Sequence, residues 1–355
     1  MSRTTLWLIL VFIGLSLAGG AALLLPVPHV AGGAGASGIS APAKPSELAL
    51  SWGVKRINAP QAWERTTGSQ GIVVAVIDSG IDTSAAPLEG KLWTNPCEIP
   101  GNGIDDDQNG YVDDVHGWDF RDGDACSLTG SKIHWHGTFV AGIIAAQPGA
   151  NEVSGVAPGI RIMDVRILDS KNLFYSTDWP KFAEAVNYAV NNGARIINLS
   201  VYSNGKPPLE FERAIARAID RGVIVVGIAG NDGKATVSYP ARYPGVLAVS
   251  ATGQSDRLAS FSNYGPEVAV AAPGEKVTSL FPGGAAGTSS GTSFAAPHVA
   301  GALALILSAN PRLSSSEAVW LLQKTASDLG PTGRDAQFGA GLVDAGLAVS
   351  TTAAK

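Results

Sequence analysis

The sequence predicts an α/β protein of three layers, with a doubly wound, mostly parallel sheet and helices on both of its faces. Short runs such as GIVVAVID at 71–78 and VIVVGIAG at 223–230 are rich in β-branched residues and almost wholly apolar, as in strands buried on both faces. Helical patterns lie between these runs, and strands that alternate with helices form parallel sheets. The composition agrees, because 45% of the 355 residues are hydrophobic and only 15% are charged.

The same patterns give the order of the elements. The helices expected at 182–193 and 209–222 end at Gly193 and Gly222, because glycine readily takes the left-handed conformation that closes a helix. In chain order we expect strands at 71–78, 160–168, 194–201, 223–230 and 246–252, and helices at 136–146, 182–193, 209–222, 293–309 and 314–326.

The first 50 residues have a composition of their own. Arg3 precedes an uncharged apolar segment at 6–25, which is long enough to span a bilayer and also suits a secretory signal. We therefore expect a signal peptide or an N-terminal signal anchor at 1–30, a flexible Gly/Ala/Pro/Ser-rich linker at 31–50, and a main domain at 51–350. Both alternatives place that domain outside the cytoplasm, either secreted or anchored to the membrane by residues 6–25.

Charge and cysteine content narrow the partners and the compartment. A net charge of −5 and a pI near 5.6 do not suit a nucleic-acid-binding protein, so we expect no nucleic acid partner. We also expect the chain to be a monomer. Cys97 and Cys126 are the two cysteines, and an even count in an exported chain predicts a disulfide. It would close a loop of about 30 residues and stabilise the fold by about 3–4 kcal/mol. The alternative is two unrelated free thiols.

Polar residues stand at the ends of several expected elements. Asp78 ends a buried strand, His136 opens a helix, Asn231 follows another strand, and Ser293 begins the helix at 293–309. Taken singly, each has a simpler explanation as a turn residue, a surface residue or a helix cap. Together, a carboxylate, an imidazole, an amide and a hydroxyl supply the groups needed for acyl transfer. In parallel sheets such groups gather at the carboxyl ends of the strands.

Four motifs around these residues resemble the subtilisin-like serine proteases. They occur in that family's order of Asp, His and Ser, which differs from the order in other serine hydrolases. The motifs are VIDSGID (76–82), HGTFVAG (136–142), AGND (229–232) and GTSFAAPHVAG (291–301).

The resemblance implies a role for each of the four residues. Ser293 attacks the scissile carbonyl, His136 acts as the base, and Asp78 orients the imidazole, while the Asn231 amide and the Ser293 N–H form the oxyanion hole. His298 lies inside the Ser293 helix and is a poor candidate for the base. The expected function is therefore an exported serine endopeptidase that hydrolyses protein or peptide substrates. Two rival hypotheses are an inactive relative that only binds peptides and a hydrolase that uses the same groups on non-peptide esters.

The resemblance also implies which residues contact the substrate and the nucleophile. Tyr202 stands where the family usually has a glycine beside the P1 side chain, P1 being the residue that supplies the scissile carbonyl. The tyrosine either constricts that pocket or points outward into solvent. Phe294 replaces a methionine common in the family, which predicts resistance to peroxide. The expected substrate-binding residues are Ser200, Val201, Tyr202, Ala229 and Gly230.

An acidic insertion at 97–126 has the pattern of a calcium loop. Asp105, Asp107, Asn109, Gly110 and Asp113 fall at positions 1, 3, 5, 6 and 9 of such a loop, and the Tyr111 carbonyl at position 7. Position 12 is His116 in place of glutamate, so Asp114 or another acid must complete the ligands. The alternative is a solvated acidic turn. We expect structural Ca²⁺, with candidate ligands Asp105, Asp107, Asn109, Tyr111, Asp113 and Asp114.

The family usually carries an inhibitory pro-domain that assists folding. The stretch between the apolar segment and Trp52 is too short for one. We therefore expect the domain to fold either unaided or with the help of a separate partner.

Overall fold

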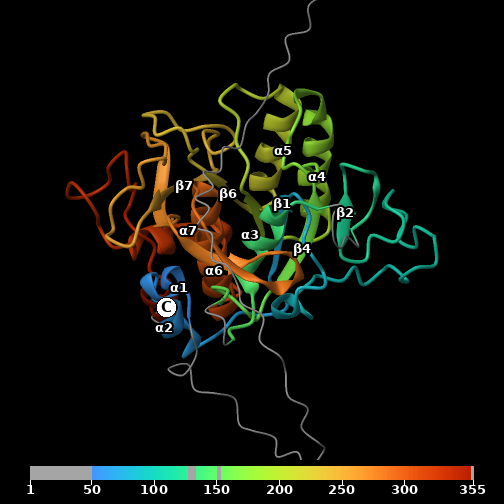
Figure 1. Ribbon diagram of the computed structural model, residues 1–355, viewed down its shortest axis with the longest axis horizontal. Coiled ribbons are helices and arrows are strands. Elements are labelled where there is room, and N and C mark those ends of the chain that lie inside the picture. Colours follow the sequence, from blue (N-terminus) through green and yellow to red (C-terminus); the bar gives the residue numbers. More distant parts are fainter. Residues whose placement is uncertain (1–49, 127–132, 150–152, 353–355) are drawn as a thin grey trace, which may run out of the picture.

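An eight-stranded sheet runs through the centre of the protein (Figure 1). The computed structural model describes residues 50–126, 133–149 and 153–352. The predicted signal or anchor at 1–30 and nearly all of the predicted linker lie outside these ranges. The strands stand in the order β3-β2-β4-β1-β5-β6-β7-β8, and all neighbours are parallel except β2 and β3. Their bounds are β1 Val73–Asp78, β2 Gly117–Asp119, β3 Asp124–Ala125, β4 Arg161–Arg166, β5 Ile196–Leu199, β6 Ile224–Ile228, β7 Leu247–Thr252 and β8 Val268–Pro273.

The position of β1 in the sheet determines where a site can form. All six residues of β1 are buried, and Val76 is paired with Asp164 of β4 on one side and with Asn198 of β5 on the other. From β1 the chain builds the sheet first toward β4 and later toward β5, so the strand order reverses beside β1. Ligands bind at such reversals, outside the carboxyl ends of the strands. Asp78 is the last residue of β1 and lies at this point.

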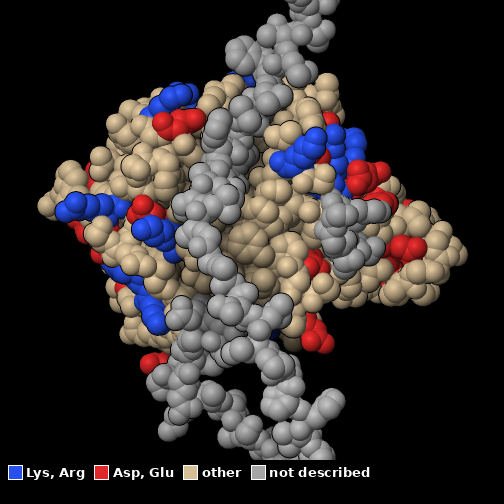
Figure 2. All heavy atoms as spheres, viewed as in Figure 1, with Lys and Arg blue, Asp and Glu red and all other residues tan. Residues whose placement is uncertain are grey.

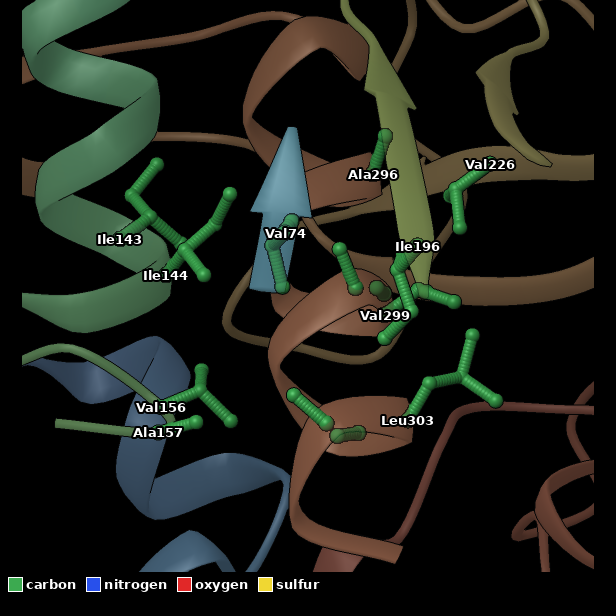
Figure 3. Packing of buried hydrophobic residues seen from close by; sticks show 14 of the residues in the cluster. Val74, Ile143, Ile144, Val156, Ala157, Ile196, Val226, Ala296, Val299 and Leu303 are labelled. Carbon is green, nitrogen blue, oxygen red and sulfur yellow. The ribbon is translucent and has the colours of Figure 1, made fainter. Parts of the chain in front are cut away.

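Helices cover both faces of the sheet. Helices α3 and α6 pack on one face, while α4 and α5 pack on the other (Figure 1). Figure 3 shows Ile143 and Ile144 of α3 on one side of Val74, with Ala296, Val299 and Leu303 of α6 on the other. The helices are α1 Trp52–Arg56, α2 Ala59–Trp63, α3 Trp135–Ala145, α4 Trp179–Asn191, α5 Leu209–Asp220, α6 Thr292–Ala309, α7 Ser315–Lys324 and α8 Ala345–Thr351. The three-layer α/β prediction is confirmed.

Helix α6 passes through the middle of the molecule. It is the one helix among the described residues that is long and apolar enough to cross a membrane, but 89% of it is buried inside the protein. Its apolar surface is covered by β5, β6, β7 and β8 and by α3, α7 and α8. The hydropathy of α6 therefore reflects a core position.

Several elements escaped the sequence prediction. Strand β8 reads VAVAAP, and its alanines and proline have low strand propensity. Helices α1 and α2 have five residues each, too few for a helical period to show. An antiparallel pair, β9 Val277–Leu280 and β10 Ala286–Ser289, forms a separate two-stranded sheet beside α3.

Candidate active site

Asp78 and His136 form a buried pair at the carboxyl end of β1. His136 Nδ1 lies 2.8 Å from Asp78 Oδ1 and 3.0 Å from Oδ2, and each residue is 1% exposed. Because Nδ1 faces a carboxylate, it carries the proton and leaves the lone pair on Nε2. Nε2 is buried and has no hydrogen-bond partner in the part of the chain that the structure describes. The imidazole therefore presents an unused acceptor.

The first turn of α3 fixes the position of His136. The Ser79 hydroxyl donates to the His134 carbonyl at 3.0 Å and accepts the Gly137 N–H at 3.0 Å. Gly137 permits this approach, since a Cβ there would lie 2.4 Å from the Gly80 carbonyl oxygen. His134 caps the helix by accepting the His136 N–H at 3.3 Å. Burial, with a smaller contribution from the nearby His136, lowers the pKa of His134 to about 4, so the cap stays neutral at ordinary pH.

Ser293 lies in the first turn of α6, at the positive end of the helix dipole. Its Oγ donates to the Ser200 carbonyl at 3.2 Å, and the Ser200 hydroxyl donates in return to the Ser293 carbonyl at 2.8 Å. The Ser293 carbonyl can accept this bond because it lacks the usual helical hydrogen bond: Pro297, four residues on, has no N–H to donate. The ring of Phe294 lies 5.5 Å from the His136 ring, centroid to centroid. This contact places the imidazole beside the start of α6.

Asn231 is held against the same end of α6. Its Oδ1 accepts the Thr292 N–H at 2.8 Å and the Thr292 hydroxyl at 2.7 Å, which leaves the Nδ2 donor available. Behind it, Asn263 Oδ1 accepts the N–H groups of Asp232 and Lys234 at 2.9 and 3.0 Å. A Cβ on Gly230 would lie 2.4 Å from Asn263 Nδ2, so only glycine lets the turn pack this closely. The sequence reasoning missed Asn263, Thr292, Ser79 and His134.

The expected substrate segments leave two adjacent strands. Ser200, Val201 and Tyr202 follow β5, while Ala229 and Gly230 follow β6, and Leu199 is paired with Gly227. Tyr202 is only 6% exposed, so it does not point outward into solvent. An apolar hollow adjoins these segments, lined by Leu168, Phe174, Trp179, Phe182, Val201, Tyr202, Tyr239 and Pro240.

His298 lies in a different environment from the candidate catalytic residues. It is fully buried, and Nδ1 is 2.7 Å from the Phe294 carbonyl. Burial lowers its pKa to about 4. Gly53 packs against the ring, because a Cβ there would lie 2.3 Å from Nε2. His298 is therefore a packed core residue, as its place in the helix predicts.

The acidic insertion brings only part of the predicted calcium ligand set together. Ligand oxygens of Glu98, Asp105 and Asp107 lie within 4.8 Å of one another, and we call these three residues the acidic cluster. Figure 2 shows acidic side chains on the segment that projects beyond β2. Glu98 was not among the predicted ligands, since it precedes the loop pattern by seven positions.

Asp113 and Asp114 do not join the acidic cluster. The Asp113 carboxylate accepts the N–H groups of residues 101–103 and so stabilises a neighbouring turn. Asp114 is fully buried, where it accepts the Tyr188 hydroxyl at 2.6 Å and the side-chain amides of Asn95 and Asn109. Burial raises the pKa of Asp114. The Tyr111 ring packs against aromatic rings, including that of Tyr188.

The predicted disulfide between Cys97 and Cys126 is contradicted, because both thiols are free. Cys97 is exposed on the insertion, whereas Cys126 is buried at the end of β3. The Cys126 thiol lies beside Asp164, and burial raises the pKa of this thiol well above the ordinary range. An even count of cysteines does not report whether the two side chains face each other.

The fold and the site define the class of protein. A parallel sheet with a buried Asp–His pair at its reversal point and a helix-borne serine is the arrangement of a serine hydrolase of α/β fold, in the chain order Asp, His, Ser. The model of the subtilase family, Peptidase_S8, matches residues 69–341, and the chain belongs to that family. It is a serine-type endopeptidase.

Individual relatives agree with this assignment. The chain is 37% identical to Subtilisin Savinase of Lederbergia lenta over 294 residues, which is 83% of this chain and 96% of the relative. It is 37% identical to an alkaline protease of Alkalihalobacillus alcalophilus over 83% of this chain and 68% of the relative. A thermophilic serine proteinase of Bacillus sp. strain AK1 is 37% identical over 81% of this chain and 64% of the relative.

Proposed function

We propose that Ser293, His136 and Asp78 are the residues that hydrolyse the peptide bond. The observation that carries the proposal is the buried contact of 2.8 Å between His136 Nδ1 and Asp78, which leaves Nε2 as an acceptor without a partner among the described residues. In the reaction, the Ser293 hydroxyl exchanges its bond to the Ser200 carbonyl for one to Nε2 and gives its proton to the imidazole. As Oγ bonds to the scissile carbonyl carbon, the resulting imidazolium is stabilised by Asp78. It then protonates the amine that leaves as the C–N bond breaks, and a water molecule, with His136 again as the base, releases the acyl group from Ser293.

The oxyanion forms between Asn231 and Ser293. Because Thr292 occupies Asn231 Oδ1, Nδ2 is the group that donates to the developing negative charge. The Ser293 N–H and the dipole of α6 support the same charge. Asn263 keeps the 230–234 turn in place and so acts as a positioning residue. An extended substrate lies along residues 200–202, of which Val201 and Tyr202 also line the apolar hollow.

Calcium fits the acidic cluster by charge and by ligand type. Residues 94–120 contain seven Asp or Glu and no Lys or Arg, and the cluster offers the hard oxygen ligands that calcium prefers. Bound calcium would neutralise this charge. Glu98 already ties the loop together by accepting the N–H groups of Asp106 and Asp113 at 2.9 and 3.1 Å. The uncharged segment at 6–25 supports a position of the enzyme outside the cytoplasm.

A fluorophosphonate probe tests the proposed roles. We expect the native protein to be labelled on Ser293 and to cleave casein, and Ser293→Ala to lose both properties. Persistent labelling of Ser293→Ala would overturn the assignment of the nucleophile. Ester cleavage without casein cleavage would overturn the proposed substrate class.

A further inference from the structure

We propose that the Tyr202 side chain fills the slot that receives the P1 side chain, so that the enzyme cleaves after small residues such as glycine, alanine and serine. The inference rests on the proposed function of Ser293 and Asn231, and it adds a specificity-determining residue. It follows from where the slot must lie and from what occupies it.

The location of the slot follows from the groups that surround the scissile carbonyl. That carbonyl must lie between Ser293 Oγ and the Asn231 amide. Residues 200–202 flank Ser293 on one side, through the two hydrogen bonds between Ser200 and Ser293. Residues 229–231 flank it on the other side, through Asn231 and Thr292. A P1 side chain therefore descends between these two segments.

The phenol of Tyr202 spans the same space. Tyr202 belongs to the first segment, yet its hydroxyl lies next to the backbone N–H of Asn231, which is on the second segment. It also lies near the carboxylate of Asp232, the residue that follows that segment. Burial raises the pKa of this hydroxyl to about 12, as expected for a phenol removed from water. The ring is part of the buried apolar cluster that also contains Ile228 and Phe294. The side chain thus starts on one wall of the slot and ends on the other.

The backbone next to Tyr202 is also restrained. Ser203 and Tyr239 form an antiparallel bridge, with Ser203 N–H to Tyr239 O at 2.8 Å and Tyr239 N–H to Ser203 O at 2.9 Å. The apolar hollow is lined by Val201 and Tyr202 and also by Tyr239 and Pro240. Outward rotation of the phenol would break its contact with Asn231 and expose an apolar ring. The buried position is therefore favoured while substrate binds.

Peptide substrates that differ only at P1 test this inference. We would compare kcat/KM for Gly, Ala, Leu and Phe at P1 in the native protein, Tyr202→Gly and Tyr202→Phe, with active sites counted by fluorophosphonate. The native protein should prefer Ala over Phe by at least about 10-fold, the scale on which a pocket separates apolar side chains. Tyr202→Gly should raise kcat/KM for Phe by about 10-fold or more and change that for Ala much less. Tyr202→Phe keeps the ring and should keep the native preference.

Each result decides the inference. Equal cleavage after Ala and Phe by the native protein would overturn it, and this measurement does not depend on any variant folding. A P1 preference that Tyr202→Gly leaves unchanged would overturn it as well. If Ser293 is labelled but kcat/KM is the same for all P1 residues, the role of Tyr202 is overturned and the proposed function stands. If Ser293 is not labelled, the proposed function itself is overturned.

Discussion

The catalytic edge of the sheet and the acidic insertion both hold buried or clustered carboxylates, but they hold them by different means. Asp78 is fixed by an imidazole and by the Ser79 N–H, on a strand packed on both faces. Glu98, Asp105 and Asp107 are held by loop N–H groups and asparagine amides. The first arrangement is complete without a cation, and the second gathers carboxylates in a stretch, residues 94–120, that contains no Lys or Arg. Changes at the edge should therefore alter the rate, and changes in the insertion should alter stability.

The largest expected effect is that of His136→Ala at the catalytic edge. Removing the base should lower kcat by about 10⁶-fold, the magnitude known for subtilisin, a member of the same family. The variant must still be folded for this comparison, because His136 is 1% exposed and its removal leaves the buried Asp78 carboxylate without its imidazole partner. Peptide hydrolysis and calorimetry on the same preparation check this. A loss of less than 10-fold, after active-site counting, would contradict the assigned base.

A second prediction concerns Asp164, which connects the two regions through its place on β4 between β1 and β2. It is 1% exposed, Oδ2 accepts the Ile81 N–H, and Oδ1 has no partner among the described residues. Burial, more than any other cause, raises its pKa to about 7. The folded protein therefore holds this proton more tightly than the unfolded chain, and stability falls as pH rises from about 4 to about 7.

The variant Asp164→Asn should not lose stability as the pH rises, because its side chain carries no titrating proton. Its free energy of unfolding should exceed that of the native protein at pH 8 by up to the order of 4 kcal/mol, and the difference should shrink toward pH 4. Asp119→Asn is the matched control, because Asp119 is equally buried but is paired with Arg166 at 2.5 Å. That variant should destabilise the fold. Urea unfolding at several pH values measures both, and a pH-independent effect of Asp164→Asn would refute the account.

Removing calcium should have a smaller effect, confined to stability. At free calcium 100-fold above its dissociation constant, EGTA should lower the free energy of unfolding by about 2.7 kcal/mol. Glu98→Gln should weaken this calcium dependence. Asp106→Asn should preserve it, because Asp106 instead accepts the Ile99 N–H and the Asn102 amide in the same loop. Thermal unfolding with and without EGTA checks the prediction, and equal melting temperatures would argue against a bound cation.

The smallest expected effect is the response to peroxide. Phe294 follows the nucleophile, and its ring lies 4.6 Å from that of Phe139, so no thioether adjoins Ser293 in the chain. Met163, on β4, is fully buried. Activity should persist at peroxide concentrations that inactivate Phe294→Met, because oxidation of a methionine there would place a polar sulfoxide beside the serine. Rapid inactivation of the native protein would show that another group is the sensitive one.

Sequence patterns were most informative where one short segment contains the whole signal. The buried run ending at Asp78 and the apolar helix after Ser293 could be recognised from neighbouring residues alone. Glu98, Asn263 and the inward position of Tyr202 could not, since each depends on contacts between segments far apart in the chain. The predicted disulfide was wrong for the same reason. The number of cysteines does not tell that Cys126 is buried while Cys97 is exposed. Strand β8 was missed because its sequence, VAVAAP, is rich in alanine, which has a low strand propensity, and its burial depends on neighbouring elements.

A crystal structure of the protein with a peptidyl phosphonate most directly tests the proposed convergence of Asp78, His136 and Ser293. It should show a bond from Ser293 Oγ to phosphorus, a phosphonyl oxygen within hydrogen-bond distance of Asn231 Nδ2, and His136 still bound to Asp78 through Nδ1. An adduct on another residue would contradict it. So would an adduct on Ser293 in which the phosphonyl oxygen points away from Asn231 and His136 is no longer bound to Asp78.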